Sequence, residues 1–324
     1  MSPSKKKRAV VTGGAGFIGS HLTEALVKRG YQIIILDDLS TGKLENIAEL
    51  LARKTQGVEV EFIRGSVTNL TLLQRLFQGM EYVFHQAAIP SVPRSIDNPK
   101  ASHEVNMTGT LNVLLAAKDK GVKKVVYASS SSVYGDTPTL PKREDMLPNP
   151  LSPYAAAKLA GEYYCQVFRE VYAMPTASLR YFNVYGPRQD PESQYAAVIP
   201  RFIKKLSEGE PPIIFGDGEQ TRDFTFIEDV VESNILAAES DSCGVFNIGR
   251  GECTTINDLA RLLIKMMGKK VEPIYEKPRS GDVKHSLADI SRARNFGYAP
   301  KYSLEIGLKK LVSKQQERPD KGKP

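Results

Sequence analysis

The sequence predicts an α/β fold with a doubly wound parallel sheet and a second, smaller α/β domain. Two observations carry this prediction. Through residues 1–181, short apolar runs alternate with segments of helical apolar spacing, the pattern of strand–helix–strand crossover units. After Arg180 the chain changes to proline- and glycine-rich connections, which indicates a separate unit. At 324 residues the chain is long enough for one large or two closely packed domains.

The short apolar runs of the first part predict buried parallel strands. These strands are expected at Ala9–Val11, Ile33–Leu36, Val60–Ile63, Tyr82–His85, Val125–Ala128 and Thr176–Arg180. The intervening helices are expected at Ser20–Arg29, Leu44–Arg53, Thr71–Phe77, Thr108–Asp119 and Pro153–Val171. The last helix has a clear start, because Ser152 can cap it and Pro153 occupies its first position, where a missing N–H costs nothing.

The net charge of +7 lies at the two ends of the chain. Residues 5–8 and residues 309–324 each carry a net +4, which leaves the rest at −1. A nucleic-acid-binding protein is expected to show a basic face on its folded domain, so no nucleic-acid partner is predicted. No apolar run approaches the about 20 residues that cross a bilayer, and no signal core follows the basic start, so we predict a cytoplasmic protein without a membrane partner.

The cysteines and histidines indicate no metal site. Three cysteines form no CxxC pair, and four histidines are scattered along the chain. We expect the three cysteines to be reduced structural thiols.

A glycine-rich loop follows the first predicted strand and opens the first predicted helix. Gly13, Gly16 and Gly19 allow a tight turn and close backbone approach, so that a pyrophosphate can sit on the helix N-terminus. The second strand ends at Asp37, 24 residues after Gly13 and close to the about 20 expected for an acid that holds the adenosine ribose. A carboxylate there repels a 2′-phosphate, so NAD is predicted over NADP. Phe17 and Ile18 lie within the same loop.

Two further strand ends are expected to complete this Rossmann-type cofactor pocket. Ser66 and Val67 end the third strand, where a hydroxyl and an apolar side chain could flank the adenine. Gln86, Ala87 and Ala88 follow the fourth strand, where small residues let the cofactor pass close to the backbone. The nucleotide domain is then expected to comprise 1–181 plus 218–251, and the second domain 182–217 plus 252–324.

Tyr154 and Lys158 are predicted to form the chemical centre. At positions i and i+4 of a helix they share one face, which puts the ammonium beside the phenol. A neighbouring cation favours phenolate and is expected to lower the tyrosine pKa from about 10, which makes Tyr154 a usable general base. Ser130, Ser131 and Ser132 follow a strand at its carboxyl end, where open α/β sheets bind ligands. Taken singly, these features could equally be a helix face and a loop, and it is their combination that indicates a site.

In combination these motifs resemble those of the extended short-chain dehydrogenase/reductases. The resemblance also covers Arg180–Arg188 and Gly216–Phe224, and runs through nearly the whole chain except its basic ends. It implies that Ser130 bonds the reacting sugar hydroxyl, that Tyr154 is the base, and that Lys158 also holds the nicotinamide ribose. It further implies cofactor contacts by Asn106 and Phe182. Substrate contacts are implied for Arg94, Ser131, Ser132, Asn183, Val198, Arg222, Arg279, Asp282 and Ser286.

Within this group the serine run favours epimerases. Dehydratases of the group carry an acid pair where this chain has Ser131 and Ser132, so elimination lacks its acid and base. In 4-epimerisation, Tyr154 takes the proton from O4 of the sugar while NAD accepts the C4 hydride, and the 4-ketose turns over before the hydride returns.

The segments Ser91–Ile96, Leu151–Ala155, Tyr195–Pro200 and Asp282–Asp289 are similar to those of UDP-N-acetylglucosamine 4-epimerases. Ser286 is expected to leave room for an acetamido group at C2. A UDP-glucose 4-epimerase or a UDP-glucuronate 4-epimerase stays open, the latter because Arg94 could meet a carboxylate. A non-catalytic NAD-binding regulator is the alternative of another class. Helices near 100–119 and 153–171 resemble those that pair two subunits, which implies a homodimer.

Overall fold

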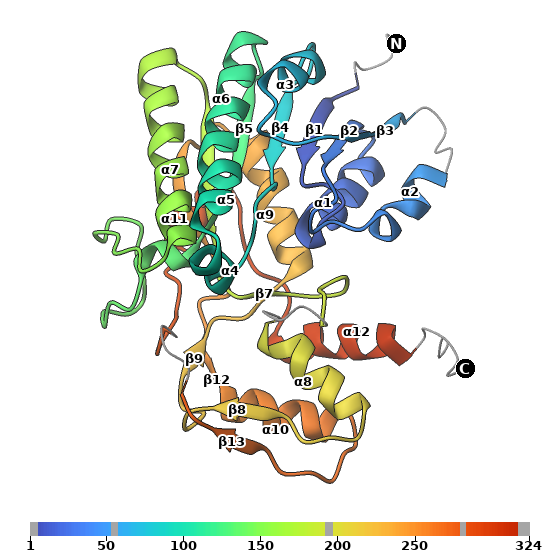
Figure 1. Ribbon diagram of the computed structural model, residues 1–324, viewed down its shortest axis with the longest axis vertical. Coiled ribbons are helices and arrows are strands. Elements are labelled where there is room, and N and C mark those ends of the chain that lie inside the picture. Colours follow the sequence, from blue (N-terminus) through green and yellow to red (C-terminus); the bar gives the residue numbers. More distant parts are fainter. Residues whose placement is uncertain (1–5, 53–57, 192–196, 279–282, 317–324) are drawn as a thin grey trace.

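A seven-stranded parallel sheet forms the centre of the computed structural model, which describes residues 6–52, 58–191, 197–278 and 283–316. Its strand order is β3-β2-β1-β4-β5-β6-β11 (Figure 1). The chain moves outward from β1 to β3 and then returns to β4 on the other side of β1, so the order reverses between β1 and β4. Ligands of open α/β sheets bind at such a switch point. The strands are β1 (Arg8–Thr12), β2 (Gln32–Asp37), β3 (Val60–Arg64), β4 (Tyr82–His85), β5 (Lys124–Ser130), β6 (Thr176–Tyr181) and β11 (Gly244–Ile248).

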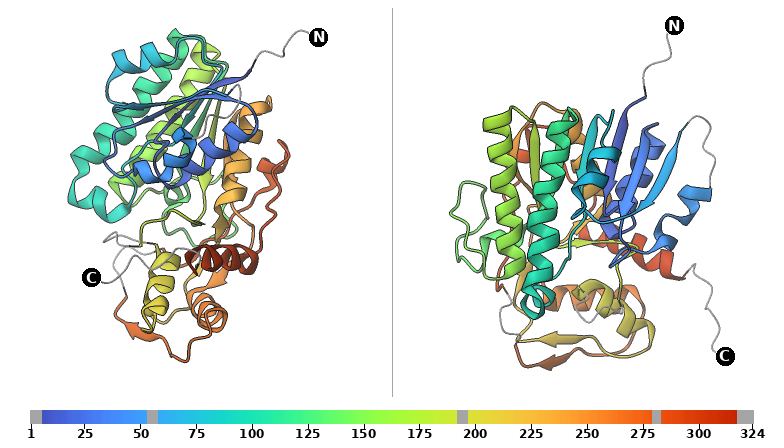
Figure 2. Two further views of the ribbon diagram at one scale, coloured as in Figure 1. Left: turned by 90° about the vertical axis from the view of Figure 1, so that its right-hand side faces the viewer. Right: turned by 45° about the horizontal axis from the view of Figure 1, so that its top comes forward.

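Helices cover both faces of this sheet, which confirms the predicted doubly wound fold. On one face α1 packs against α9, and on the other α6 lies between α3 and α7 (Figures 1 and 2). Helix α7 begins as predicted, because Ser152 Oγ accepts a hydrogen bond from the Ala155 N–H at 3.1 Å and Pro153 holds the first position. The helices of this part are α1 (Phe17–Lys28), α2 (Ala48–Ala52), α3 (Leu70–Leu76), α4 (Val92–Asp97), α5 (Pro99–His103), α6 (Gly109–Asp119), α7 (Pro153–Tyr172) and α9 (Ile227–Glu239).

One predicted helix is interrupted in the structure. The expected helix at 44–53 is a 3-10 turn, η1 (Leu44–Asn46), followed by the short α2, and residue 53 lies outside the described part. Asn46 Nδ2 and the Lys43 N–H both donate to Ala15 O, which ties this segment to the glycine loop and interrupts it. Before α6 the chain forms a π-helical turn, η2 (Glu104–Thr108), and a 3-10 turn, η3 (Ser131–Tyr134), follows β5.

A smaller group of elements lies below the sheet in Figure 1. Its described strands pair two by two: β8 with β13, β9 with β12, and β7 with β10. Helices α8 and α10 pack against each other beside them. These elements are β7 (Val184–Tyr185), α8 (Val198–Ser207), β8 (Ile213–Phe215), β9 (Thr221–Arg222), β10 (Thr225–Phe226), β12 (Thr254–Thr255), α10 (Ile256–Met266), β13 (Ile274–Glu276) and α12 (Leu304–Gln316). The short α11 (Ser291–Arg294) lies instead beside the sheet and packs on β11 (Figure 1).

Two buried carboxylates attach the C-terminal part of the chain to the rest. Asp223 accepts hydrogen bonds from the backbone N–H groups of Arg250, Gly251 and Ala288 at 2.7–3.1 Å. Asp229 on α9 accepts from two further backbone N–H groups, those of residues 301 and 302. Each acid therefore satisfies donors of segments that lie far away in the sequence.

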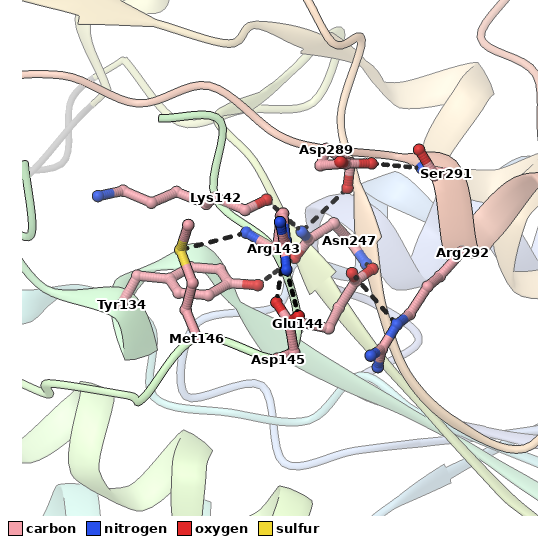
Figure 3. Close-up of polar contacts among 10 residues, drawn as sticks. All are labelled: Tyr134, Lys142, Arg143, Glu144, Asp145, Met146, Asn247, Asp289, Ser291 and Arg292. Carbon is pink, nitrogen blue, oxygen red and sulfur yellow. Dashed lines mark hydrogen bonds and ion pairs between the residues drawn. The ribbon is translucent and has the colours of Figure 1, made fainter. Parts of the chain in front are cut away.

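Asn247 on β11 gathers a third set of distant segments (Figure 3). Its Oδ1 accepts from the Tyr134 hydroxyl at 2.7 Å, and its backbone N–H donates to Glu144 Oε1 at 2.7 Å. Its amide also donates to the carbonyls of Lys142 and Asp289 at 2.8 and 3.0 Å. The loop after β5 and the segment before α11 are thus both anchored on the same sheet strand.

Candidate active site

The glycine loop packs its backbone closely against neighbouring backbone and leaves a helix N-terminus open. Gly13 adopts a φ of +68°, and a Cβ atom there would lie 2.6 Å from Ala87 N. A Cβ atom on Gly19 would lie 2.1 Å from Gly13 O. Helix α1 begins at Phe17 with Gly16 as its N-cap, so no side chain caps its first N–H groups. The helix N-terminus therefore presents its donors and positive dipole end to an anion.

Asp37 ends β2 directly beside this loop. Its side chain is buried, with Oδ2 accepting from the Ala15 N–H at 3.0 Å and Oδ1 from the Leu39 N–H at 2.9 Å. Burial raises the pKa of this carboxyl, and the backbone hydrogen bonds oppose that shift. A carboxylate acceptor in this position suits ribose hydroxyls, so the residues present fit NAD.

A cleft of about 850 Å³ joins the loop to the carboxyl ends of the neighbouring strands. Its lining contains most of the cofactor residues predicted from the sequence, together with the predicted substrate residue Arg94. Those cofactor residues are Gly13, Gly16, Phe17, Ile18, Gly19, Asp37, Ser66, Val67, Gln86, Ala87, Ala88, Tyr154 and Lys158.

Asn106 and Phe182 are not among the residues that line this cleft. The buried Asn106 side chain accepts from the Ile89 N–H at 2.8 Å and donates to Ile89 O at 3.0 Å, so it holds the loop after β4. Phe182 is buried, with its ring 6.2 Å from that of Tyr134. Their contact with a cofactor stays a prediction.

Tyr154 and Lys158 project from α7 toward the end of β5. The Tyr154 phenol is hydrogen-bonded to the Ser130 hydroxyl. Lys158 Nζ lies 5.8 Å from the Tyr154 ring centroid and donates to Ala128 O at 2.7 Å. The three residues predicted to act together therefore lie together, with Tyr154 and Lys158 lining the cleft and Ser130 beside Tyr154 but not among the lining residues.

The expectation that Lys158 lowers the pKa of Tyr154 is not met in this structure. Burial raises the pKa of Tyr154, and the hydrogen bond from Ser130 opposes that rise. Burial also lowers the pKa of Lys158 to about 7. At this buried site the loss of hydration shifts both pKa values more than the attraction between the two side chains does. The spacing of residues in a sequence does not reveal how deeply they are buried.

Ser131 and Ser132 form the 3-10 turn η3 just beyond Ser130. Ser130 Oγ accepts from the Ser132 N–H at 3.2 Å, which fixes the turn. Within the described part of the chain, Ser132 Oγ is one of three buried polar side-chain atoms with no hydrogen-bond partner. A buried hydroxyl without a partner is a candidate contact for a ligand hydroxyl.

A second cavity of about 220 Å³ lies among the elements below the sheet. Its lining includes three predicted substrate residues, Asn183, Val198 and Arg222. Ala197 lines both this cavity and the larger cleft, so the two adjoin.

The remaining predicted substrate residues of the second unit are Arg279, Asp282 and Ser286. Arg279 and Asp282 lie outside the described residues. Ser286 is 9% exposed, its N–H donates to Thr221 O, and it lines neither cavity.

Sequence reasoning missed a buried ion pair at this site. Glu162 and Arg180 are both 3% exposed and lie 2.7 Å apart. Glu162 is one helical turn beyond Lys158, so a second i+4 step along α7 could have indicated it. Arg180 could not be placed beside it without the strand order. In the described ranges no group of three or more His, Cys, Asp or Glu could hold a metal ion, and no helix could span a membrane.

The fold and the glycine loop define an NAD-binding protein of the Rossmann type, and the Ser-Tyr-Lys arrangement is that of the extended short-chain dehydrogenase/reductases. The sequence pattern of the NAD dependent epimerase/dehydratase family matches residues 9–249. The chain belongs to this family, and NAD is its cofactor.

Similar proteins cover nearly the whole chain. A UDP-glucose 4-epimerase of Mycolicibacterium smegmatis is 40% identical over 94% of this chain and 97% of its own. A UDP-N-acetylglucosamine 4-epimerase of Methanobrevibacter ruminantium, solved with UDP-N-acetylmuramic acid, has a TM-score of 0.91 and 41% identity over 95% of this chain and 98% of its own. A UDP-glucuronic acid 4-epimerase of Bacillus cereus, solved with UDP-glucuronic acid and NAD, has a TM-score of 0.87 and 38% identity over 95% and 99%.

Proposed function

We propose that this chain is a UDP-hexose 4-epimerase that interconverts UDP-N-acetylglucosamine and UDP-N-acetylgalactosamine, and also UDP-glucose and UDP-galactose. The observation that carries the proposal is the position of Tyr154, whose phenol meets the Ser130 hydroxyl at the wall of the dinucleotide cleft. The adjoining cavity lined by Arg222 and Asn183 offers a place for the UDP moiety. The 4-epimerases similar to this chain support the reaction type.

Each residue of this wall has one task in the proposed reaction. Tyr154 removes the proton from O4 of the sugar and later returns it. Ser130 shares a hydrogen bond with that phenol and orients the same hydroxyl. The Lys158 ammonium, held by Ala128 O, stabilises the phenolate. NAD, when bound, supplies hydride acceptance and return at C4.

UDP-glucuronate is the second candidate substrate, because Arg94 lines the cleft and could meet a carboxylate. Asp190 lines the same cleft and pairs with Lys43 at 3.1 Å. A carboxylate in the cleft lining disfavours an anionic hexuronate. We therefore propose a neutral hexose.

Incubation with UDP-glucose, UDP-N-acetylglucosamine and UDP-glucuronate, each followed by NMR of the products, tests the proposal. We expect the 4-epimers of the first two. A protein that retains NAD and converts none of them would instead be the non-catalytic regulator. Ser286→Tyr refines the choice: if Ser286 faces the sugar C2 substituent, the variant loses the N-acetylated pair and keeps UDP-glucose. Equal loss of both pairs would remove Ser286 from that role.

We further propose that residues 1–181 plus 218–251 form the NAD domain and 182–217 plus 252–324 the UDP-sugar domain. In support, β11 pairs with β6 in the central sheet and α9 packs on α1. The short strands β8 and β13 and the helices α8 and α10 pack together elsewhere. Segment 291–294 packs on β11, so the second domain is also fastened to the first.

We also propose a homodimer formed through α7. Tyr163, Val167 and Val171 are 48–65% exposed on this helix, at i, i+4 and i+8. An apolar stripe of this kind on a long surface helix is a candidate protein interface. A second copy of the same helix is its proposed partner.

A further inference from the structure

Helix α7 presents three functional groups to β5, not two. Tyr154, Lys158 and Glu162 follow one another at i+4 steps and therefore share one face. Each contacts a different residue at the carboxyl end of β5. The contacts join Tyr154 to Ser130, Lys158 to Ala128 O and Glu162 to Ser129 Oγ.

Glu162 is held more firmly than a structural ion pair at a surface would be. Arg180 Nε and Nη2 donate to its two carboxylate oxygens at 2.9 and 2.7 Å, and Ser129 donates to one of them. Arg180 lies on β6 directly opposite Ser129 in the strand register. The carboxylate is thus fixed by two neighbouring strands and the helix that covers them.

The far side of Arg180 is fixed as well. Its guanidinium lies 4.6 Å from the Tyr134 ring centroid, and the Tyr134 hydroxyl donates to Asn247 Oδ1. Figure 3 shows Tyr134 reaching this asparagine on β11. The orientation of Glu162 therefore depends on contacts that extend over three strands.

Glu162 is the anionic group whose field acts on Lys158. On α7, Lys158 faces Tyr154 and Glu162. On the strands it faces Tyr127 of β5, 5.1 Å from Nζ to the ring centroid, and His85 of β4, while Arg180 of β6 binds Glu162. Burial and the nearby Lys158 lower the pKa of His85 to about 3, so this histidine is neutral. Burial also lowers the pKa of Lys158, and Glu162 opposes that shift.

We propose that Glu162, held by Arg180 and Ser129 one helical turn from Lys158, is a positioning residue that keeps Lys158 in its ammonium form beside Tyr154. This inference rests on the proposed roles of Tyr154 and Lys158 in 4-epimerisation. Without the carboxylate, Lys158 would stand in a buried site and lack the anion that favours its charged form. It would then give up its proton at a lower pH.

Direct titration of Lys158 tests the proposal. NAD-bound protein labelled with ¹³C at lysine Cε is titrated by NMR, and the Lys158 resonance is assigned by its absence in Lys158→Arg. In Glu162→Gln we expect its midpoint to fall by about 1 pH unit. The alkaline limb of the kcat–pH profile should move in the same direction. An unchanged Lys158 midpoint in folded Glu162→Gln would overturn the proposal.

Two matched variants separate charge from packing. Ser129→Ala removes the hydrogen bond to Glu162 without changing any charge, so the Lys158 midpoint should stay at the wild-type value. Glu162→Gln/Arg180→Gln removes both charges of the buried ion pair, so Arg180 is not left without a partner, and its midpoint should lie between those of Glu162→Gln and wild type. A lowered midpoint in a protein that converts no UDP-sugar would refute the proposed function and support the link between Glu162 and Lys158.

Discussion

At the scale of single residues, the phenol of Tyr154 is placed by its neighbours more than by its own helix. Ser130 and the Lys158 ammonium approach it from β5 and from the next turn of α7. Burial raises its pKa and so works against the phenolate that a general base needs. For Tyr154 to act as the proposed base, the residues around it must lower its pKa again when substrate and NAD are bound.

Replacing Tyr154 by Phe removes the proposed base and keeps the ring. Turnover should fall by about 10²–10⁴-fold, the range typical of losing a general base, while UDP binding changes little because UDP is proposed to lie in the other cavity. Initial rates and calorimetry measure the two effects. Tyr275→Phe, at a 55% exposed tyrosine, is the matched control. Near-normal turnover in Tyr154→Phe would remove Tyr154 from the catalytic role.

Arg222→Ala tests the second cavity. Arg222 lines it and also donates to Thr221 O at 2.8 Å. Loss of a charge-assisted contact to a diphosphate should weaken UDP binding by about 1.5–3 kcal/mol, as measured by calorimetry. Arg261→Ala, on the exposed side of α10, should leave UDP affinity unchanged. Equal affinities in the two variants would place the diphosphate elsewhere.

The residues of the site differ in how far the sequence could predict them. The i, i+4 spacing was enough to pair Tyr154 with Lys158, because helix geometry is local. The contact of Arg180 with Glu162 required the neighbouring positions of β5 and β6, which only the fold supplies. The proton affinities of Tyr154 and Lys158 depend on burial, which no spacing of residues reveals.

At the scale of elements, β1, the glycine loop and α1 form one unit with Asp37 at the end of β2. The sequence predicted the six strands of the first part within about two residues, since parallel strands are buried on both faces and give continuous apolar runs. The strands of two or three residues in the smaller unit were not predicted. Such strands owe their existence to partners far away in the sequence and have no local signal.

From the unit formed by β1, the glycine loop, α1 and Asp37, we predict that the protein retains NAD during purification. An epimerase returns its hydride in every cycle, so it has no need to exchange cofactor. Protein heated to release its ligands should yield about one NAD and no NADP per chain, as measured by enzymatic cycling assays for each dinucleotide. A requirement for added NADP would contradict the assignment of Asp37.

At the scale of the whole molecule, the part built on the sheet is proposed to bind NAD, and the smaller unit is proposed to bind the UDP-sugar. The larger cleft belongs to the sheet, and the smaller cavity is lined by β7, α8, β8 and β9. They adjoin at Ala197, so the sugar would bridge the two units. The chain returns to the sheet through α9 and β11 between its two visits to the smaller unit.

A homodimer through α7 predicts the effect of a charge in the exposed stripe. Val167→Asp should weaken self-association at least about tenfold, because an unpaired buried charge is costly in an interface. Analytical ultracentrifugation over a range of concentrations measures this change. Ile274→Asp, at a 48% exposed residue of β13, is the control. A monomeric wild-type protein would contradict the dimer.

The acids that bind distant backbone N–H groups have a consequence for variation of the sequence. Asp223 and Asp229 accept from the main chain of residues 250, 251, 288, 301 and 302, and any amino acid except proline provides that donor. The two acids should thus be intolerant of change, whereas Lys301 should accept most replacements. Saturation mutagenesis scored by folded yield measures this asymmetry. Equal tolerance at both ends of these bonds would mean that they do not hold the C-terminal segment in place.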